Sequence, residues 1–186
     1  AKRVSMQKSF TNDADFLKSL DMVSVVKGFD KFNIPRVAQL SQRSNQFNLR
    51  TVRYTDAEIF AIEKNDNYVT FSFTLKDKFG DNGLICVIIL NKKNTETLFV
   101  DTWFMSCRVL KRGMENFALN TIVEWAKING FKKIVGEYLP TAKNAMVEQH
   151  YPNLGFTKIE GGETMQYVLD VNSYKPFECY IKRIIE

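Results

Sequence analysis

The sequence predicts an α+β fold in which a mixed, mainly antiparallel sheet carries helices on both faces. The apolar pattern is helical in the first third, alternates from Tyr68, and returns to helical spacing from Met114. The run LICVIIL, residues 84–90, is apolar on both faces, which is typical of a central strand. A strand–helix–strand crossing around residues 113–135 requires one parallel pair within the sheet.

The first third of the chain has helical patterns only. FLKSL, residues 16–20, predicts a short helix. Pro35 suits the first turn of a second helix, residues 35–47, because its missing N–H would be unpaired there in any case. Thr55 and Glu58 have the spacing of a capping box at the start of a third helix.

The rest of the chain predicts six strands and two helices. Residues 68–110 indicate a three-stranded antiparallel meander, and its third strand is expected to run from 97 to 110. A helix over 114–126 and a strand over 132–139 follow, and then a helix over 144–151. Gly161-Gly162 predicts the turn of the last hairpin.

The length of 186 residues fits one domain. We expect a helical lead-in or linker over residues 1–54, the domain proper over 55–171, and a C-terminal extension over 172–186. The last of these is rich in aromatic residues but shows no clear period.

Composition excludes several classes of protein. A hydrophobic content of 45% and an aromatic content of 13% exclude disorder. The basic residues behind the net charge of +5 are scattered, which argues against nucleic-acid binding. No apolar window approaches the roughly 18 residues of a membrane span. Three cysteines do not make a disulfide framework and a single histidine makes no multi-histidine metal site, so we expect a cytoplasmic protein without a metal.

The stretch NAMVEQHYPNLGF resembles the GNAT acyltransferase superfamily, whose members often read N-x-x-A-x-x-L-Y-x-x-x-G-F before the last hairpin. Asn144, Tyr151, Gly155 and Phe156 match this pattern, and Val147 replaces its alanine. The order of the predicted elements also matches GNAT topology. In that family the tyrosine often protonates the departing thiolate, a role that suits a phenol with a reference pKa of about 10. The resemblance makes Tyr151 the candidate acid.

The helix predicted from Met114 begins at a basic turn. The free N–H groups of a helix N-terminus attract phosphate, so Lys111, Arg112 and Gly113 form either a phosphate site or a tight turn with two solvated bases. The GNAT pyrophosphate signature, R-x-x-G-x-G/A, is not kept, since Glu115 and Phe117 stand where small residues belong. This departure argues against the binding of ordinary acyl-CoA. It is less unfavourable for a pantetheine arm on a carrier protein, which has no nucleotide.

Longer motifs are more specific. PRVAQLSQRSNQFNLRTVRYTDAEI, GDNGLI, SCRVLKRGMENF and GEYLPTAKNA resemble the carboxy-terminal part of FkbH-like proteins. Together with NAMVEQHYPNLGF these motifs span residues 35–156. In that family a haloacid-dehalogenase-type phosphatase domain precedes this region, and the pair is associated with glyceryl groups on acyl carrier proteins in polyketide-type synthesis. The phosphatase's aspartate-rich motif is absent, so we expect a fragment that holds only the GNAT-like domain.

The resemblance implies a domain that handles an acyl or glyceryl group on the pantetheine thiol of CoA or of an acyl carrier protein. The arm would lie between the strand that ends near Cys107 and the strand that ends near Glu137. The expected cofactor-binding residues are Cys107, Arg108, Val109, Lys111, Arg112, Gly113, Met114 and Asn144. The alternative is a non-catalytic module that docks the acyl carrier protein or the phosphatase domain, since carrier proteins are acidic and this chain is basic.

Three further features remain open from the sequence. Glu137 is the first candidate for a catalytic base and Asp101 the second, against the alternative of solvent-facing strand carboxylates. Cys107, beside Arg108, is either a reactive thiol or a small residue in a strand. The amide cluster Asn45–Asn48 either lines a pocket or caps the preceding helix.

Overall fold

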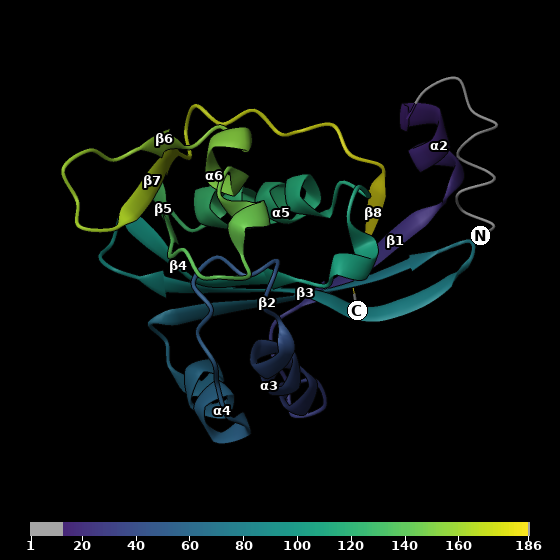
Figure 1. Ribbon diagram of the computed structural model, residues 1–186, viewed down its shortest axis with the longest axis horizontal. Coiled ribbons are helices and arrows are strands. Elements are labelled where there is room, and N and C mark those ends of the chain that lie inside the picture. Colours follow the sequence, from purple (N-terminus) through teal and green to yellow (C-terminus); the bar gives the residue numbers. More distant parts are fainter. Residues whose placement is uncertain (1–12, 186) are drawn as a thin grey trace.

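The computed structural model describes residues 13–185; Glu186 and the first twelve residues of the expected lead-in lie outside that range. An eight-stranded mixed sheet runs in the order β6-β7-β5-β4-β3-β2-β1-β8 (Figure 1). In chain order the elements are α2 (Asp13–Ser19), β1 (Met22–Lys27), α3 (Ile34–Arg43), α4 (Asp56–Lys64), β2 (Tyr68–Asp77), β3 (Gly80–Lys92), β4 (Thr97–Met105), η1 (Cys107–Val109), α5 (Met114–Ile128), β5 (Lys133–Tyr138), η2 (Ala145–Val147), α6 (His150–Asn153), β6 (Thr157–Lys158), β7 (Met165–Asp170) and β8 (Ile181–Ile184).

Helices cover both faces of the sheet, as the sequence predicts. Figure 1 shows α3 and α4 on one face and α5 and α6 on the other. Two apolar clusters follow from this, and β3 contributes to both of them. Cys86, Ile88 and Leu90 belong to the larger cluster beneath α5 and α6, whereas Val87 and Ile89 belong to the cluster against α3 and α4. The prediction of a central strand that is buried on both faces is confirmed.

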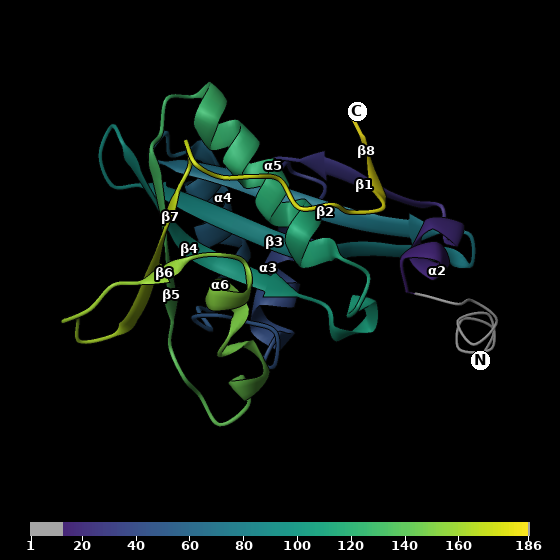
Figure 2. The ribbon, with the colours of Figure 1, turned by 90° about the horizontal axis from the view of Figure 1, so that it is seen from above.

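The predicted strand pairing is also confirmed. β2, β3 and β4 form an antiparallel meander. β4 pairs with β5 in parallel, and α5 makes the connection between them by crossing over the sheet (Figure 2). β6 and β7 form the antiparallel hairpin that closes this side of the sheet.

Two predicted helix starts are confirmed. Pro35 lies in the first turn of α3, where its missing N–H costs no hydrogen bond. Thr55 caps α4 by accepting from the Glu58 backbone N–H, and the Glu58 carboxylate accepts in return from the Thr55 backbone N–H. The second helix nevertheless ends at Arg43, four residues before the expected end.

The prediction of helices alone in the first third was wrong, because β1 lies there, and β8 in the C-terminal extension was also missed. β1 pairs antiparallel with β2, and β8 pairs in parallel with β1. β1 is only six residues long, and β8 buries only Ile181, so neither carries enough alternation to stand out from the sequence. Both strands are stabilised by their neighbours in the sheet rather than by local pattern.

Two other boundaries also differ from the prediction. The third strand ends at Met105, because the Ser106 hydroxyl accepts from the Arg108 N–H and turns the chain into η1. The helix expected over residues 144–151 is two short turns, η2 and α6. Their backbone bonds begin with Val147 N–H to the Asn144 carbonyl, a three-residue step rather than an α-helical one.

Candidate functional site

β4 and β5 are paired over a short distance only. Thr97–Phe99 face Lys133–Val135, and beyond that point the strands diverge (Figure 2). β4 carries a bulge at the same place, since Leu90 of β3 faces Val100 while Ile89 faces Thr102. Asp101 is the extra residue of this bulge, so its carbonyl is released from the ladder. Divergence and bulge together make the gap that the sequence predicts between these strands.

The chain itself fills this gap. Phe47–Leu49, from the loop between α3 and α4, lies between the two strands; we refer to it as the inserted segment. Its hydrogen bonds run from Leu49 N to the Trp103 carbonyl (3.2 Å), from Met105 N to the Phe47 carbonyl (3.0 Å), from Leu139 N to the Leu49 carbonyl (2.9 Å) and from Asn144 Nδ2 to the Asn48 carbonyl (3.0 Å). The inserted segment therefore pairs with backbone groups of β4 and of Leu139, the residue after β5.

Asn144 lies fully buried beside the inserted segment. Its Oδ1 accepts from Thr141 N at 2.8 Å, and its Nδ2 also donates to the Leu139 carbonyl at 3.0 Å. These bonds fix the loop after β5 against the inserted segment. A direct contact of Asn144 with a cofactor stays a prediction, because its amide is fully used in this arrangement.

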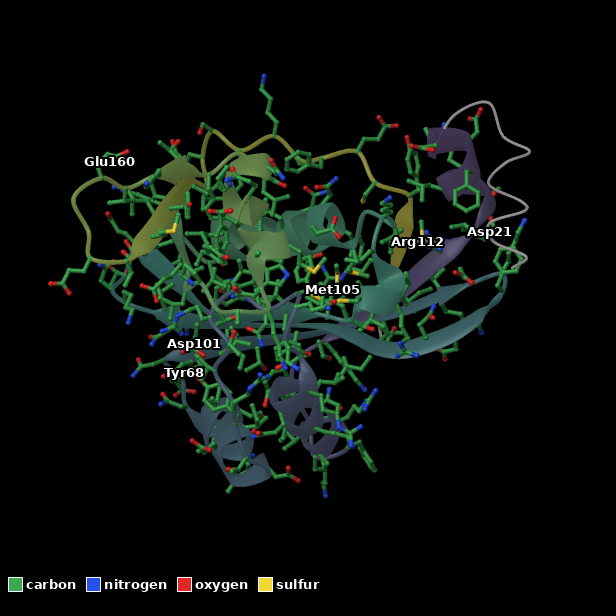
Figure 3. The ribbon with its side chains drawn as sticks, in the orientation of Figure 1. Asp21, Tyr68, Asp101, Met105, Arg112 and Glu160 are labelled. Atoms are coloured by element: carbon green, nitrogen blue, oxygen red, sulfur yellow. The ribbon has the colours of Figure 1, made fainter. Side chains whose placement is uncertain are left out.

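Arg50 follows the inserted segment and joins the two candidate base residues. Its Nε donates to Glu137 Oε1 at 2.9 Å, and its Nη1 donates to the released Asp101 carbonyl at 2.7 Å and lies 3.5 Å from Asp101 Oδ1. The Tyr54 hydroxyl donates to Asp101 Oδ2 at 2.6 Å. Figure 3 shows Asp101 on the side of the sheet that carries α4. One guanidinium thus balances two carboxylates in a largely buried cluster.

Glu137 has its acceptor positions occupied. Burial alone would raise the pKa of Glu137, but hydrogen bonds from Thr164, Gln166 and Arg50 outweigh it and hold the pKa below its usual value. A base that works at neutral pH needs a raised pKa and a free lone pair. The role of Glu137 as a base therefore stays a prediction, and in this conformation the carboxylate acts as an anchor for Arg50.

Replacing Arg50 with methionine is expected to lower the free energy of unfolding by about 2 kcal/mol. The substitution leaves Asp101 and Glu137 without a cation in a largely buried place; the value is below that of a fully buried pair because the Arg50 side chain is 20% exposed. Urea unfolding measures the effect. Arg36→Met, on the exposed surface of α3, is the matched control and should change stability by less than about 0.5 kcal/mol. Equal stability of the two variants would contradict the assigned role of Arg50.

Tyr151 lies on the opposite face of the sheet from the two carboxylates. Its ring packs against Gly136, among the rings of Trp103, Phe156 and Tyr167. Side chains alternate along a strand, so Gly136 faces Tyr151 while Glu137 faces Arg50. The Tyr151 hydroxyl is buried and has no hydrogen-bond partner within residues 13–185. Burial also raises the pKa of Tyr151 well above its usual value.

His150 lies next to Tyr151 and is also buried. Its ring packs edge-on against Trp103, Phe47 and Tyr151. Burial lowers the pKa of His150 to about 3, so the ring is neutral at physiological pH. Its Nε2 has no partner in the described part of the chain. Trp103 Nε1, on the ring that contacts both side chains, is a third buried polar atom without a partner among residues 13–185.

A cavity of about 310 Å³ opens at the N-terminus of α5, on the Tyr151 side of the sheet. Lys111, Glu115 and Asn116 line it from α5 and the preceding turn, and His150 and Phe47 form its inner wall. Burial raises the pKa of Glu115 above its usual value. Gly113 caps α5 with a φ of 82°, a conformation that glycine adopts without strain.

The remaining predicted cofactor-binding residues do not converge on this cavity. Val109 and Met114 are core side chains. Arg108 binds Ser106 and the Asn82 carbonyl, and Arg112 lies over the ring of Phe16 in α2. Their roles in cofactor binding stay predictions. Of the predicted cofactor-binding residues, Lys111 and Gly113 lie at the N-terminus of α5. Cys107 lines a different cavity.

Cys107 lines a second cavity, of about 550 Å³, on the other side of Phe47. Leu40, Arg43, Ser44, Asn45, Gln46, Phe47, Met105, Ser106 and Lys143 complete its lining. The amide cluster does both things that the sequence left open: Asn45 and Gln46 line this cavity, while Asn48 Nδ2 donates to the Ser44 carbonyl at the end of α3. Phe47 borders both cavities.

The sequence patterns did not single out four residues of the site: Arg50, Thr164, Gln166 and His150. Arg50 and Glu137 are 87 positions apart, and no local pattern signals such a pair. Gln166 faces Glu137 across β5 and β7, so correct pairing of the predicted hairpin with the preceding strand would have found it.

Among residues 13–185, no three metal-ligating side chains are grouped to hold an ion. No helix in that range is long and apolar enough to cross a bilayer.

No protein-family model matches the chain, and no curated protein matches it. Solved structures do. A domain from Methanocaldococcus jannaschii aligns with a TM-score of 0.62 at 15% identity, covering 81% of this chain and 99% of that one. The GNAT domain of S. lividans PAT aligns with a TM-score of 0.59 at 16% identity, covering 78% and 89%. Spermidine N-acetyltransferase from Vibrio cholerae, solved with CoA and spermine, aligns with a TM-score of 0.56 at 11% identity, covering 82% and 96%. The chain has the GNAT fold.

Proposed function

We propose that this domain binds the pantetheine arm of an acyl-CoA or of an acyl carrier protein and transfers the acyl or glyceryl group from its thiol. The observation that carries the proposal is the gap between β4 and β5, which opens after three paired residues beside the N-terminus of α5. Helix N-terminal N–H groups favour a phosphate, and the backbone groups of diverging strand ends, once the inserted segment releases them, favour the amides of a pantetheine arm.

The inserted segment sets a condition on this function. It occupies the backbone positions that the arm would use, so the arm enters only when Phe47–Leu49 leaves the gap. Its departure would also uncover the Tyr151 hydroxyl and His150 Nε2, which have no partner among residues 13–185 in the closed form. Tyr151 would then be placed to protonate the departing thiolate.

The FkbH-like resemblance supports a carrier protein as the source of the arm. The net charge of +5 suits an acidic carrier, and Glu115 stands where the nucleotide's pyrophosphate would need a small residue. A phosphatase domain of the haloacid-dehalogenase type would be the second partner. The carrier's arm ends in one phosphodiester, so the N-terminus of α5 would have to bind one phosphate group rather than the pyrophosphate of CoA.

Tyr151→Phe tests the catalytic role. The lost hydroxyl has no partner in the described structure, so the variant is expected to match the parent in stability or exceed it by up to about 1 kcal/mol. If Tyr151 is the acid, release of the acyl group from an acylated phosphopantetheinyl carrier protein should slow by about 10²-fold or more. Mass spectrometry of the carrier measures transfer, and thermal unfolding measures stability. Unchanged transfer in Tyr151→Phe would remove this residue from the mechanism.

A second candidate function is docking without transfer. The observation that favours it is the closed gap itself, since four hydrogen bonds and the Arg50 cluster hold the inserted segment in place. Calorimetric titration with acetyl-CoA and with the phosphopantetheinylated carrier separates the two functions. Carrier binding with no transfer supports docking, and binding with transfer supports the enzyme. Failure of both ligands to bind would overturn both functions.

A further inference from the structure

The 550 Å³ cavity beside Cys107 lies outside the gap between β4 and β5. Its volume is within the range of small-molecule sites, about 300–1,000 Å³. Phe47 and Met105, both buried, give it an apolar floor, and Asn45 and Gln46 bring carboxamides to its wall. Cys107 is exposed at its edge, and its Sγ lies 3.4 Å from Gln46 Oε1. Apolar floor, polar wall and an accessible thiol are the parts of a binding site for a small organic molecule.

The charged groups in this cavity have one sign. Arg43 and Lys143 line it, and among residues 13–185 neither an aspartate nor a glutamate contributes to its lining. The C-terminal carbonyls of α3, which would add negative potential, are neutralised by Arg53, whose Nη1 donates to the Ser41 and Ser44 carbonyls at 2.6 Å each. Arg53 also binds the Asn45 side chain, which fixes this carboxamide in the wall. The cavity therefore attracts anions.

The cavity at the mouth of α5 differs in this respect. There Lys111 is accompanied by Glu115, and the lining carries one charge of each sign. The cavity beside Cys107 is thus the more favourable of the two for a small anion. Phe47 lies between them, so a ligand in one does not contact the lining of the other beyond that ring.

We propose that the cavity lined by Arg43, Lys143 and Cys107 is a binding site for a small anionic molecule that carries a phosphate or carboxylate group, with the Cys107 thiol beside the bound ligand. This site does not depend on acyl transfer in the β4–β5 gap. The two cations hold the anionic group, the carboxamides bind its polar remainder, and Phe47 and Met105 contact its carbon skeleton.

Alkylation of the full chain by iodoacetate and by iodoacetamide tests the proposal. The two reagents attack the same thiolate and differ in charge, so their rate ratio reports the local potential and cancels the thiolate fraction. Cys179 is the internal control, and Cys86 is fully buried. At low ionic strength the iodoacetate-to-iodoacetamide ratio is expected to be about three- to five-fold higher at Cys107 than at Cys179. Peptide mass spectrometry measures both sites in one sample.

Substitutions and competing ligands complete the test. Arg43→Gln with Lys143→Gln should lower the Cys107 ratio while Arg108 stays in place, whereas Lys92→Gln with Lys93→Gln, at the distant β3–β4 turn, should leave it unchanged. Inorganic phosphate or phosphoglycolate should slow iodoacetamide at Cys107, and neutral glycerol should not. Stronger protection by phosphoglycolate identifies an organic anion, and equal protection identifies free phosphate. Equal ratios at the two cysteines, or no protection by either anion, would overturn the proposal.

Discussion

Gly136→Ala is expected to lower the free energy of unfolding by about 3 kcal/mol, enough to change the melting temperature by many degrees. A Cβ at this position would lie 2.3 Å from Cε1 and Cζ of Tyr151, far inside van der Waals contact. The Tyr151 ring is 1% exposed and is held by Trp103, Phe156 and Tyr167, so it has no free space to enter. Urea unfolding, fitted as a two-state transition, measures the loss.

A double-substitution cycle assigns this loss to the contact. Tyr151→Val alone should cost about 3 kcal/mol through the cavity that it leaves. In the double variant the new methyl group occupies part of that cavity, so its loss should be at least about 1 kcal/mol smaller than the sum of the two single losses. Gly28→Ala is the control, since the Cβ that it adds would lie 3.4 Å from its nearest neighbour, Thr70 Oγ1. If the two single losses simply add in the double variant, the loss in Gly136→Ala does not come from contact with the Tyr151 ring.

Stability is expected to fall by about 2 kcal/mol between pH 7 and pH 5 because of His150. The folded chain holds this imidazole neutral, with a pKa of about 3, whereas the unfolded chain binds a proton below its ordinary value of about 6.5. As the pH falls below 6.5 the unfolded state gains a proton that the folded state does not, at about 1.4 kcal/mol per pH unit. The loss continues until the pH reaches the folded pKa.

The chain's single histidine makes this prediction easy to isolate. His150→Leu should remove most of the slope between pH 7 and pH 5. Glu115 contributes with the opposite sign, because burial raises its pKa, and it is present in both proteins, so the difference between the two slopes belongs to His150. Glu137 has a lowered pKa and titrates below this window. An NMR titration in which the folded imidazole protonates near pH 6.5 would contradict the prediction.

Much of the fold was predictable because its signals are local. The capping box at Thr55, the alternation from Tyr68 and the helical spacing after Met114 each occur within a dozen residues, and each element lies where expected. The strands β1 and β8 were not predictable from the sequence. Short strands at one side of a sheet are stabilised by neighbouring strands, which the local sequence does not reveal.

The sequence predicted where the gap between β4 and β5 lies, but it did not predict that Phe47–Leu49 fills this gap. The gap between β4 and β5 follows from the predicted parallel pair, and Glu137, Asp101 and Tyr151 all lie around it. That Phe47–Leu49 closes the gap depends on bonds to Trp103, Leu139 and Asn144, far along the chain. Sequence spacing carries no information about such long-range contacts, and for the same reason Arg50 was not recognised.

The inserted segment also has a consequence for the order of folding. The bond from Asn144 to the Asn48 carbonyl spans 96 positions, so its loop closes only after β4 and β5 are in place. Contacts of this kind form late and open early, and hydrogen exchange should find the amides of Leu49 and Leu139 less protected than those of the central strand β3. The inserted segment would then be the last part of the chain to fold and the first to detach. It could leave the gap while the sheet stays folded.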